Sequence, residues 1–168
     1  MTKINFQRIL NFLFLIAFLL FGACAGPQRF VRKAPAPEDM PKHGVFVNPL
    51  PGSHVISNFG PRGREFHEGI DLKKSKKGGD FVIAARAGMV KFAKKQSGYG
   101  RMVLIRHKDG CYTRYAHLKK IFVEEGQTVA AGEKIGTVGS SGRATTPHLH
   151  FEIITRTGCP VNARPYLK

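Results

Sequence analysis

Apolar residues in the larger, C-terminal part of the chain recur in short runs that often alternate with polar residues. These runs are rich in β-branched and aromatic residues, and no stretch of helical period is long enough to compete with them. Short strands that are regularly spaced and separated by glycine predict an all-β domain, built as an antiparallel sandwich or barrel. The runs that predict strands are residues 55–56, 69–72, 81–84, 89–92, 102–106, 112–117, 134–138 and 148–155.

The turns between these runs carry their own signals. Lys108-Asp109-Gly110 separates two of the predicted strands, and Asp-Gly is typical of a tight hairpin turn. We therefore expect the two flanking strands to be antiparallel neighbours. Further breaks are supplied by glycine at positions 78, 79, 98, 126, 132, 139 and 142.

The N-terminus has a different pattern, with a continuous apolar segment over residues 9–21 that only Asn11 interrupts. Lys3 and Arg8 precede or flank its start. The segment is too short to span a bilayer comfortably, since a transmembrane helix needs about 20 apolar residues. We interpret residues 1–23 as a secretory signal peptide.

The end of this segment, Phe21-Gly22-Ala23-Cys24, resembles the lipobox of bacterial lipoproteins, although Phe21 stands where leucine is usual. Cleavage there would leave Cys24 as a lipidated first residue that anchors the chain to a membrane. Two alternatives stay open, namely an ordinary signal peptide that is cut after Ala23 or Ala25 and an uncleaved anchor. All three place the rest of the chain outside the cytoplasm.

Prolines and basic residues dominate the segment that follows. Positions 27, 35, 37, 41, 49 and 51 are proline, and no apolar period is sustained there. We interpret residues 24–50 as a tether and residues 51–168 as the folded domain. For an anchored protein, the tether sets how far from the membrane the domain can reach.

The chain is strongly basic, with a formal net charge of +16. Such a field attracts polyanions without selecting among them. Because the chain is exported, we expect the anionic cell envelope as a partner and no nucleic acid. The lysines at positions 73, 74, 76 and 77 could contribute to this attraction or could simply lie in a solvated loop. Of the two remaining cysteines, Cys111 and Cys159, we expect free thiols, with a disulfide as the alternative. The sequence assigns no oligomeric state.

Residues with metal-binding chemistry interrupt the predicted strands. His148 and His150 alternate with apolar Leu149, so both rings project to one face of a strand. His67 and Asp71 are four residues apart, a separation that shares a face on a strand and on one helical turn. Together His67, Asp71 and His150 offer two nitrogens and one carboxylate oxygen, the ligand set of a catalytic zinc whose fourth position stays open for water.

A third element, Tyr115-Ala116-His117-Leu118, completes a set that resembles a known family. In order and spacing, the three elements resemble those of the lysostaphin-type or LytM-type peptidases, family M23, which are zinc endopeptidases that cut peptidoglycan cross-bridges. The resemblance covers about residues 48–167. It implies a β-domain of the duplicated hybrid motif type with the active site in a groove above one sheet.

The resemblance also implies roles for single residues. Zn2+ would be held by His67, Asp71 and His150, while His117 and His148 would be catalytic. These two would orient or deprotonate water and donate to the oxyanion, without a division of the roles between them. The implied function is hydrolysis of peptide stems or cross-bridges of peptidoglycan by a membrane-anchored protein of the bacterial cell envelope. The alternative is a non-catalytic module that binds the wall and activates a cell-wall amidase.

Five further residues lie near these motifs. Glu152 shares the parity of the two histidines on its strand; we expect it on the surface, with a hydrogen bond to an imidazole as the alternative. Tyr115 could line the groove or pack in the core. Arg62 and Ser141 lie in segments that match family loops beside the groove, and His107, which matches no family element, is expected on the surface.

Overall fold

The structure, a computed structural model, describes residues 34–42 and 45–168. The predicted signal peptide, Cys24 and the first part of the predicted tether lie outside the described residues. In the described part of the chain, no helix is long and apolar enough to cross a membrane. The strands are β1 (His54–Ser57), β2 (Gly60–Arg62), β3 (Glu65–His67), β4 (Ile70–Lys73), β5 (Phe81–Ile83), β6 (Gly88–Gln96), β7 (Gly100–Arg106), β8 (Tyr112–Ile121), β9 (Thr128–Val129), β10 (Lys134–Val138), β11 (Leu149–Ile154) and β12 (Pro160–Val161), with 3-10 turns at Pro37–Asp39 and Arg164–Tyr166.

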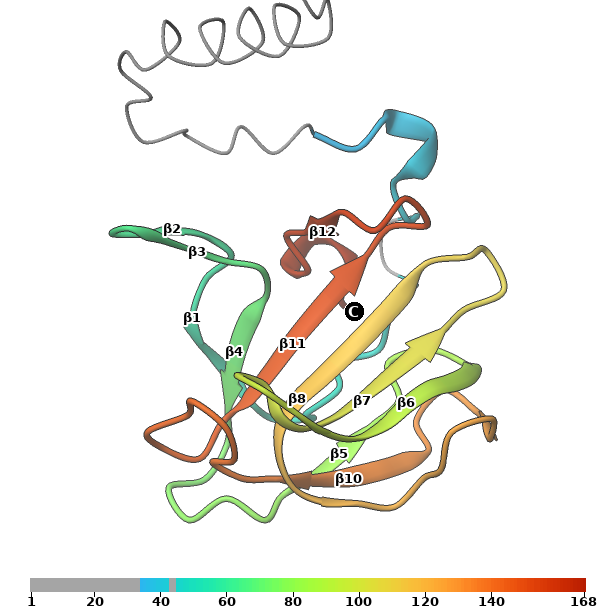
Figure 1. Ribbon diagram of the computed structural model, residues 1–168. Coiled ribbons are helices and arrows are strands. Elements are labelled where there is room, and N and C mark those ends of the chain that lie inside the picture. Colours follow the sequence, from blue (N-terminus) through green and yellow to red (C-terminus); the bar gives the residue numbers. More distant parts are fainter. Residues whose placement is uncertain (1–33, 43–44) are drawn as a thin grey trace, which may run out of the picture. The chain divides into compact units, whose positions relative to one another are not determined.

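Ten of the strands form one sheet, whose main path runs β1-β4-β11-β8-β7-β6-β9 (Figure 1). All paired strands are antiparallel, which confirms the expected fold class. The predicted hairpin joins β7 to β8, and every predicted strand is present. The strands β2 and β3 form a separate hairpin that projects beside β4 and was not predicted. Its short, mostly exposed strands carry little apolar pattern.

The longest strand, β8, joins two parts of the sheet. Its residues 112–116 pair with β11, whereas residues 118–121 pair with β10, which also pairs with β5. The change of partner falls at His117, whose φ of 62° is the only positive value at a non-glycine residue in the described ranges. One hydrophobic core packs between these parts of the sheet and includes Val82, Val103, Tyr115, Ile135 and Phe151.

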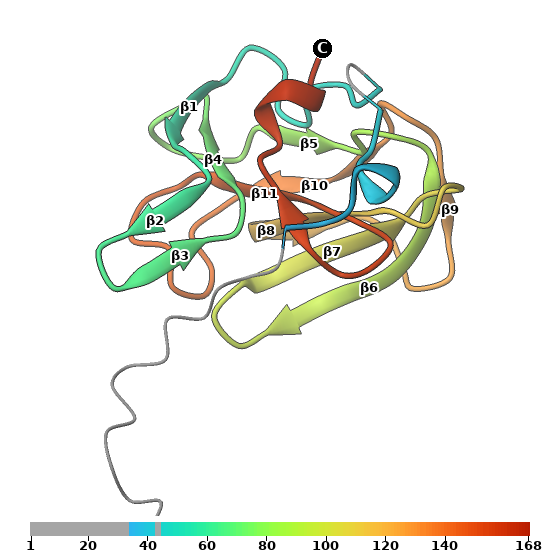
Figure 2. The ribbon, with the colours of Figure 1, turned by 90° about the horizontal axis from the view of Figure 1, so that it is seen from above.

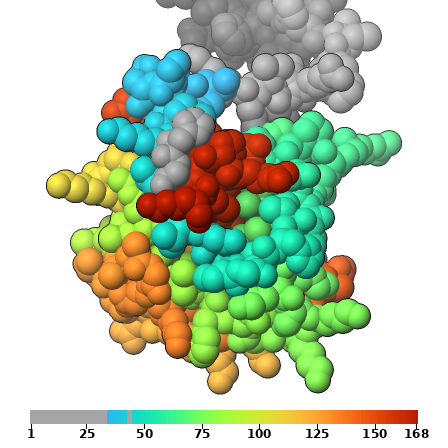
Figure 3. Space-filling model, turned by 180° about the vertical axis from the view of Figure 1, so that it is seen from behind, coloured from blue at the N-terminus to red at the C-terminus, as the bar shows by residue number. Residues whose placement is uncertain are grey.

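The folded domain begins earlier than the sequence indicates. Phe46 and Leu50, which the sequence places in the tether, are both fully buried. Phe46 pairs with Leu167, and its carbonyl accepts a hydrogen bond from the Lys168 N–H (3.0 Å). Figures 2 and 3 show the C-terminal segment, drawn in red, beside the segment around residues 45–60. The prolines suggested a tether. The sequence did not reveal the pairing of Phe46 with Leu167, because a single bridge needs no alternation of apolar and polar residues.

His107 and Tyr115 both belong to the interior. His107 was expected on the surface but is 3% exposed. Its Nδ1–H donates to the Ala87 carbonyl (3.0 Å), and its Nε2 is hydrogen-bonded to the Thr113 hydroxyl (3.0 Å). Thr113 is also bonded to the hydroxyl of Tyr115 (2.9 Å), which packs in the core. Burial lowers the pKa of His107, so the ring is neutral at physiological pH.

The cysteines of the domain are unbonded. Cys111 is buried and Cys159 is half-buried. The residues that follow them, Tyr112 and Pro160, pair with Ile154 from its two sides. One strand therefore separates the cysteines, and two inter-strand spacings of about 4.8 Å exceed the reach of a disulfide.

We predict that Phe46→Ala lowers the free energy of unfolding by about 3–5 kcal/mol, because it leaves a cavity in the core. Urea denaturation of the domain from residue 34 onward would measure this change. The control is Phe122→Ala, since Phe122 is 47% exposed, and it should cost no more than about 1 kcal/mol. Equal effects of the two substitutions would contradict the assignment of residues 45–50 to the fold.

Candidate metal centre

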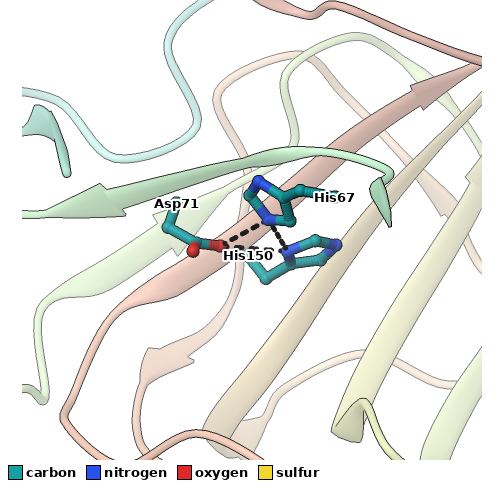
Figure 4. Close-up of side chains that lie close together, drawn as sticks. All are labelled: His67, Asp71 and His150. Atoms are coloured by element: carbon teal, nitrogen blue, oxygen red, sulfur yellow. Dashed lines mark hydrogen bonds and ion pairs between the residues drawn. The ribbon is translucent and has the colours of Figure 1, made fainter. Parts of the chain in front are cut away.

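Three predicted side chains converge where β3, β4 and β11 meet (Figure 4). His67 ends β3, Asp71 is the second residue of β4, and His150 pairs directly with Asp71 across the sheet. His67 Nε2 lies 3.1 Å from Asp71 Oδ1 and 3.0 Å from His150 Nδ1. His150 Nδ1 is 3.0 Å from the same Oδ1, and all three residues are buried. The structure thus brings the predicted ligand set together.

The spacing of these three atoms fits a small tetrahedral cation. Their separations of 3.0 to 3.1 Å are nearly equal. The ligands of a tetrahedral zinc, at bond lengths of about 2.0–2.1 Å, are about 3.3 Å apart. A slight outward movement of the side chains would therefore suffice to hold the ion. Two imidazoles and one carboxylate also match the chemistry that zinc prefers.

Hydrogen bonds on the outer side fix which ring nitrogen faces the centre. His67 Nδ1–H donates to the Asn58 carbonyl (2.7 Å), so its Nε2 carries a lone pair towards Asp71. His150 Nε2–H donates to Glu152 Oε1 (2.9 Å), so its Nδ1 is the atom available to a metal. Both tautomers are therefore set by the fold, as is usual for metal-binding histidines.

Glu152 is fully buried, and the expectation that it lies on the surface is wrong. All six residues of its strand β11 are buried, and Arg114 and His150 lie against its carboxylate. Burial raises the pKa of Glu152, but the hydrogen bond from His150 and the charge of Arg114 outweigh burial and lower it. Glu152 is therefore a carboxylate. The sequence did carry a signal for the hydrogen bond to His150, because Glu152 lies an even number of positions after His148 and His150 and so shares their face of the strand.

The charges around the ligands favour a cation between them. Burial alone would raise the pKa of Asp71, but the adjacent imidazoles of His150 and His67 and a hydrogen bond from Arg62 Nη2 (2.7 Å to Oδ2) hold it far below its usual value. Burial would lower the pKa of His150, but the adjacent carboxylates of Asp71 and Glu152 raise it. The position between two carboxylates is thus suited to positive charge. From the sequence we expected Arg62 beside the groove but did not predict its ion pair with Asp71.

His117 and His148 lie beside the ligands and complete the predicted set. Their ring centroids are 4.9 Å apart, and that of His117 is 5.8 Å from that of His150. His117 Nδ1–H donates to the Ser141 carbonyl, and His148 Nδ1–H donates to the Thr146 carbonyl, both at 2.8 Å. In each ring Nε2 is therefore the nitrogen left for proton transfer. Burial lowers the pKa of His117 to about 4, so it is a neutral base at physiological pH.

All five predicted residues line one open groove of about 880 Å³. Arg62 and Phe66 of the β2–β3 hairpin form one wall, and Tyr99 lies on another. Ser141 does not line it; its hydroxyl accepts from the Arg101 N–H (2.9 Å) and donates to a carbonyl of β8, which fixes the loop that holds His117. The groove is large enough for an extended peptide segment.

The chain is similar to known proteins in sequence and in structure. The model of "Peptidase family M23" matches residues 65–163, which include all five residues. The DD-carboxypeptidase/endopeptidase Mpg of Neisseria meningitidis serogroup B is 41% identical over 127 residues, 72% of this chain and 29% of Mpg. The murein hydrolase activator NlpD of Salmonella dublin is 41% identical over 114 residues, 67% of this chain and 29% of NlpD. The chain thus spans less than a third of the length of these relatives.

A solved structure supports the same assignment. The crystal structure of a zinc-containing peptidase from Vibrio cholerae has a TM-score of 0.65 to this chain at 34% identity, and the match covers 72% of this chain and 40% of that one. The family model matches more than half of the chain, and its match includes the ligand cluster and both further histidines. The chain therefore belongs to peptidase family M23.

Proposed function

We propose that this chain is a zinc-dependent endopeptidase that hydrolyses the peptide stems or cross-bridges of peptidoglycan. The observation that carries this proposal is the set of five predicted side chains that line one groove. Each of the four histidines has one ring nitrogen hydrogen-bonded outward, so that its other ring nitrogen is the one left for a metal or for proton transfer. Family M23 accounts for the peptidase class. The relative Mpg, named a DD-carboxypeptidase/endopeptidase, supports peptidoglycan as the substrate.

His67, Asp71 and His150 would hold the zinc ion. When bound, zinc supplies Lewis acidity, which makes water a stronger acid and polarises the scissile carbonyl. Because the ligand set contains a single carboxylate, the site keeps one net positive charge, which suits an anionic transition state. Arg62 Nη2 donates to Asp71 Oδ2 (2.7 Å), so Oδ1 would be the oxygen available to the metal.

His117 and His148 provide acid–base chemistry in the groove. Burial keeps His117 neutral, so its Nε2 can accept a proton from the attacking water. His148 offers a second Nε2, 3.8 Å from Asp71 Oδ1, beside the same centre. A proton gained by either ring can be returned to the leaving nitrogen. The carbonyls of Ser141 and Thr146 hold both rings in place during these transfers.

A second function, activation of an amidase without catalysis, is favoured by one observation. The activator NlpD is as similar to this chain as Mpg is, at 41% identity. An activator that does not hydrolyse its substrate needs neither a neutral base nor three converging metal ligands. The retained histidines and aspartate therefore support the enzyme.

We predict that His150→Ala removes zinc and hydrolysis together, whereas His117→Ala keeps one zinc per chain and lowers turnover by about 10²–10⁴-fold, the usual contribution of a general base. Metal content by mass spectrometry and release of new amino groups from purified peptidoglycan would be measured in one preparation. His54→Ala, on exposed β1, is the control and should change neither quantity.

Two results would contradict this scheme. A His117 variant that cuts at the parental rate would remove that residue from the reaction. If the parental protein binds zinc but releases no amino groups from peptidoglycan, the activator function would be favoured instead.

We also propose that the protein is a lipoprotein of the bacterial cell envelope, anchored through Cys24. The support is the charged and apolar start of the chain and the small residues before this cysteine. An anchored domain with a basic surface would lie close to anionic wall polymers and lipids.

Replacement of the anchoring residue tests this location. Cys24→Ser should abolish incorporation of labelled fatty acid and move the protein from the membrane fraction to the soluble extract, because the thiol is the site of acylation. Cys111→Ser is the matched control and should leave both unchanged. Continued membrane retention of the Cys24 variant would instead favour an uncleaved anchor.

A further inference from the structure

A buried polar array lies behind His150, on the side away from the predicted metal. Glu152 Oε1 accepts the Nε2–H of His150 at 2.9 Å. Arg114 Nη1 donates to both oxygens of Glu152, at 3.0 and 2.8 Å, and to the hydroxyl of Tyr99 at 2.5 Å. The guanidinium also stacks over the Tyr99 ring, with 4.4 Å from Cζ to the ring centroid. These contacts form a chain from the wall of the groove to a metal ligand.

The strand register builds this array. Glu152 pairs directly with Arg114 across β11 and β8, so the carboxylate and the guanidinium face each other on one side of the sheet. Glu152 has no exposed surface, and a buried carboxylate is retained only when it is paired and hydrogen-bonded. Among the described residues, Arg114 Nε is buried without a hydrogen-bond partner, and the hydrogen bonds to Glu152 come from Nη1.

We propose that Glu152 is a positioning residue that fixes the ring of His150 so that Nδ1 faces the metal, and that Arg114 and Tyr99 hold Glu152 for this purpose. A ring without the outer acceptor can rotate and can carry its proton on Nδ1. In either case its lone pair no longer points at the other two ligands. Carboxylates that accept from a metal-binding histidine act in this way in other metalloproteins.

The inference rests on the proposed zinc site, so its test reads metal binding and ring geometry rather than turnover. Glu152→Gln removes the charge and keeps the shape. The carboxylate accepts from both His150 and Arg114. The amide of glutamine has one oxygen that can accept and a nitrogen that can only donate, so it cannot satisfy both donors. We expect zinc affinity, measured by competition with a chelator, to fall about 10–100-fold.

A double variant guards against misfolding. Glu152→Leu with Arg114→Met leaves neither an unpaired buried charge nor an acceptor for the His150 Nε2–H, so the domain should fold while the ring still loses its anchor. Zinc affinity should fall by a similar factor in this variant. The control is Asp109→Asn, which removes the carboxylate of another ion pair, that with Arg86, and should leave zinc affinity within about twofold of the parent.

The proton on His150 Nε2 gives a second readout. It donates to Glu152 whether or not a metal is bound, so NMR should show it in slow exchange with water in the parent and in faster exchange in the Glu152 variants. Unchanged exchange and unchanged zinc affinity would overturn the proposal, as would an equal loss of affinity in Asp109→Asn. A parent that binds no zinc would overturn the proposed function, while the exchange measurement would still decide the role of Glu152.

Discussion

The register of three adjacent strands is the constraint on which the site depends. His150 on the central strand β11 pairs with Asp71 of β4 on one side and with Ala116 of β8 on the other. A slip by one residue would turn His150 to the opposite face of the sheet. Gly69 permits this register, because a Cβ there would lie 2.4 Å from the Phe151 carbonyl oxygen. The close approach of β4 to β11 therefore requires a residue without a side chain.

A local break in β8 brings His117 to the groove. Tyr115 and Leu118 are both fully buried in the core although they are three positions apart, an odd spacing that would put them on opposite faces of a regular strand, so strand alternation fails between them. The break is the positive φ of His117, a conformation that costs about 1–3 kcal/mol at a non-glycine residue. In an unbroken strand His117 would share the face of Tyr115 and enter the core. Strain is thus localised at a residue that lines the groove.

Local pattern explains what could be predicted, and distance along the chain explains what could not. Strand alternation and short motifs predicted the all-β class and the three side chains that converge, because alternation is a local property and each motif is only a few residues long. The bonds from Arg114 to Glu152 and from Arg62 to Asp71 join residues on different strands, and their partners follow only from the register. The pairing of Phe46 with the C-terminus was hidden for the same reason.

The electrostatics of the site follow from two carboxylate–arginine pairs around one imidazole. Asp71 is held by Arg62 and lies at Nδ1 of His150, while Glu152 is held by Arg114 and lies at Nε2. Each arginine adds to the effect of the imidazoles in keeping its carboxylate ionised and offsets the carboxylate charge at longer range. The ring therefore experiences two nearby negative groups in an environment that is otherwise nearly neutral. A cation at Nδ1 would be stabilised there without a large excess of negative charge. Such an excess would weaken the acidity that a metal ion would give to bound water.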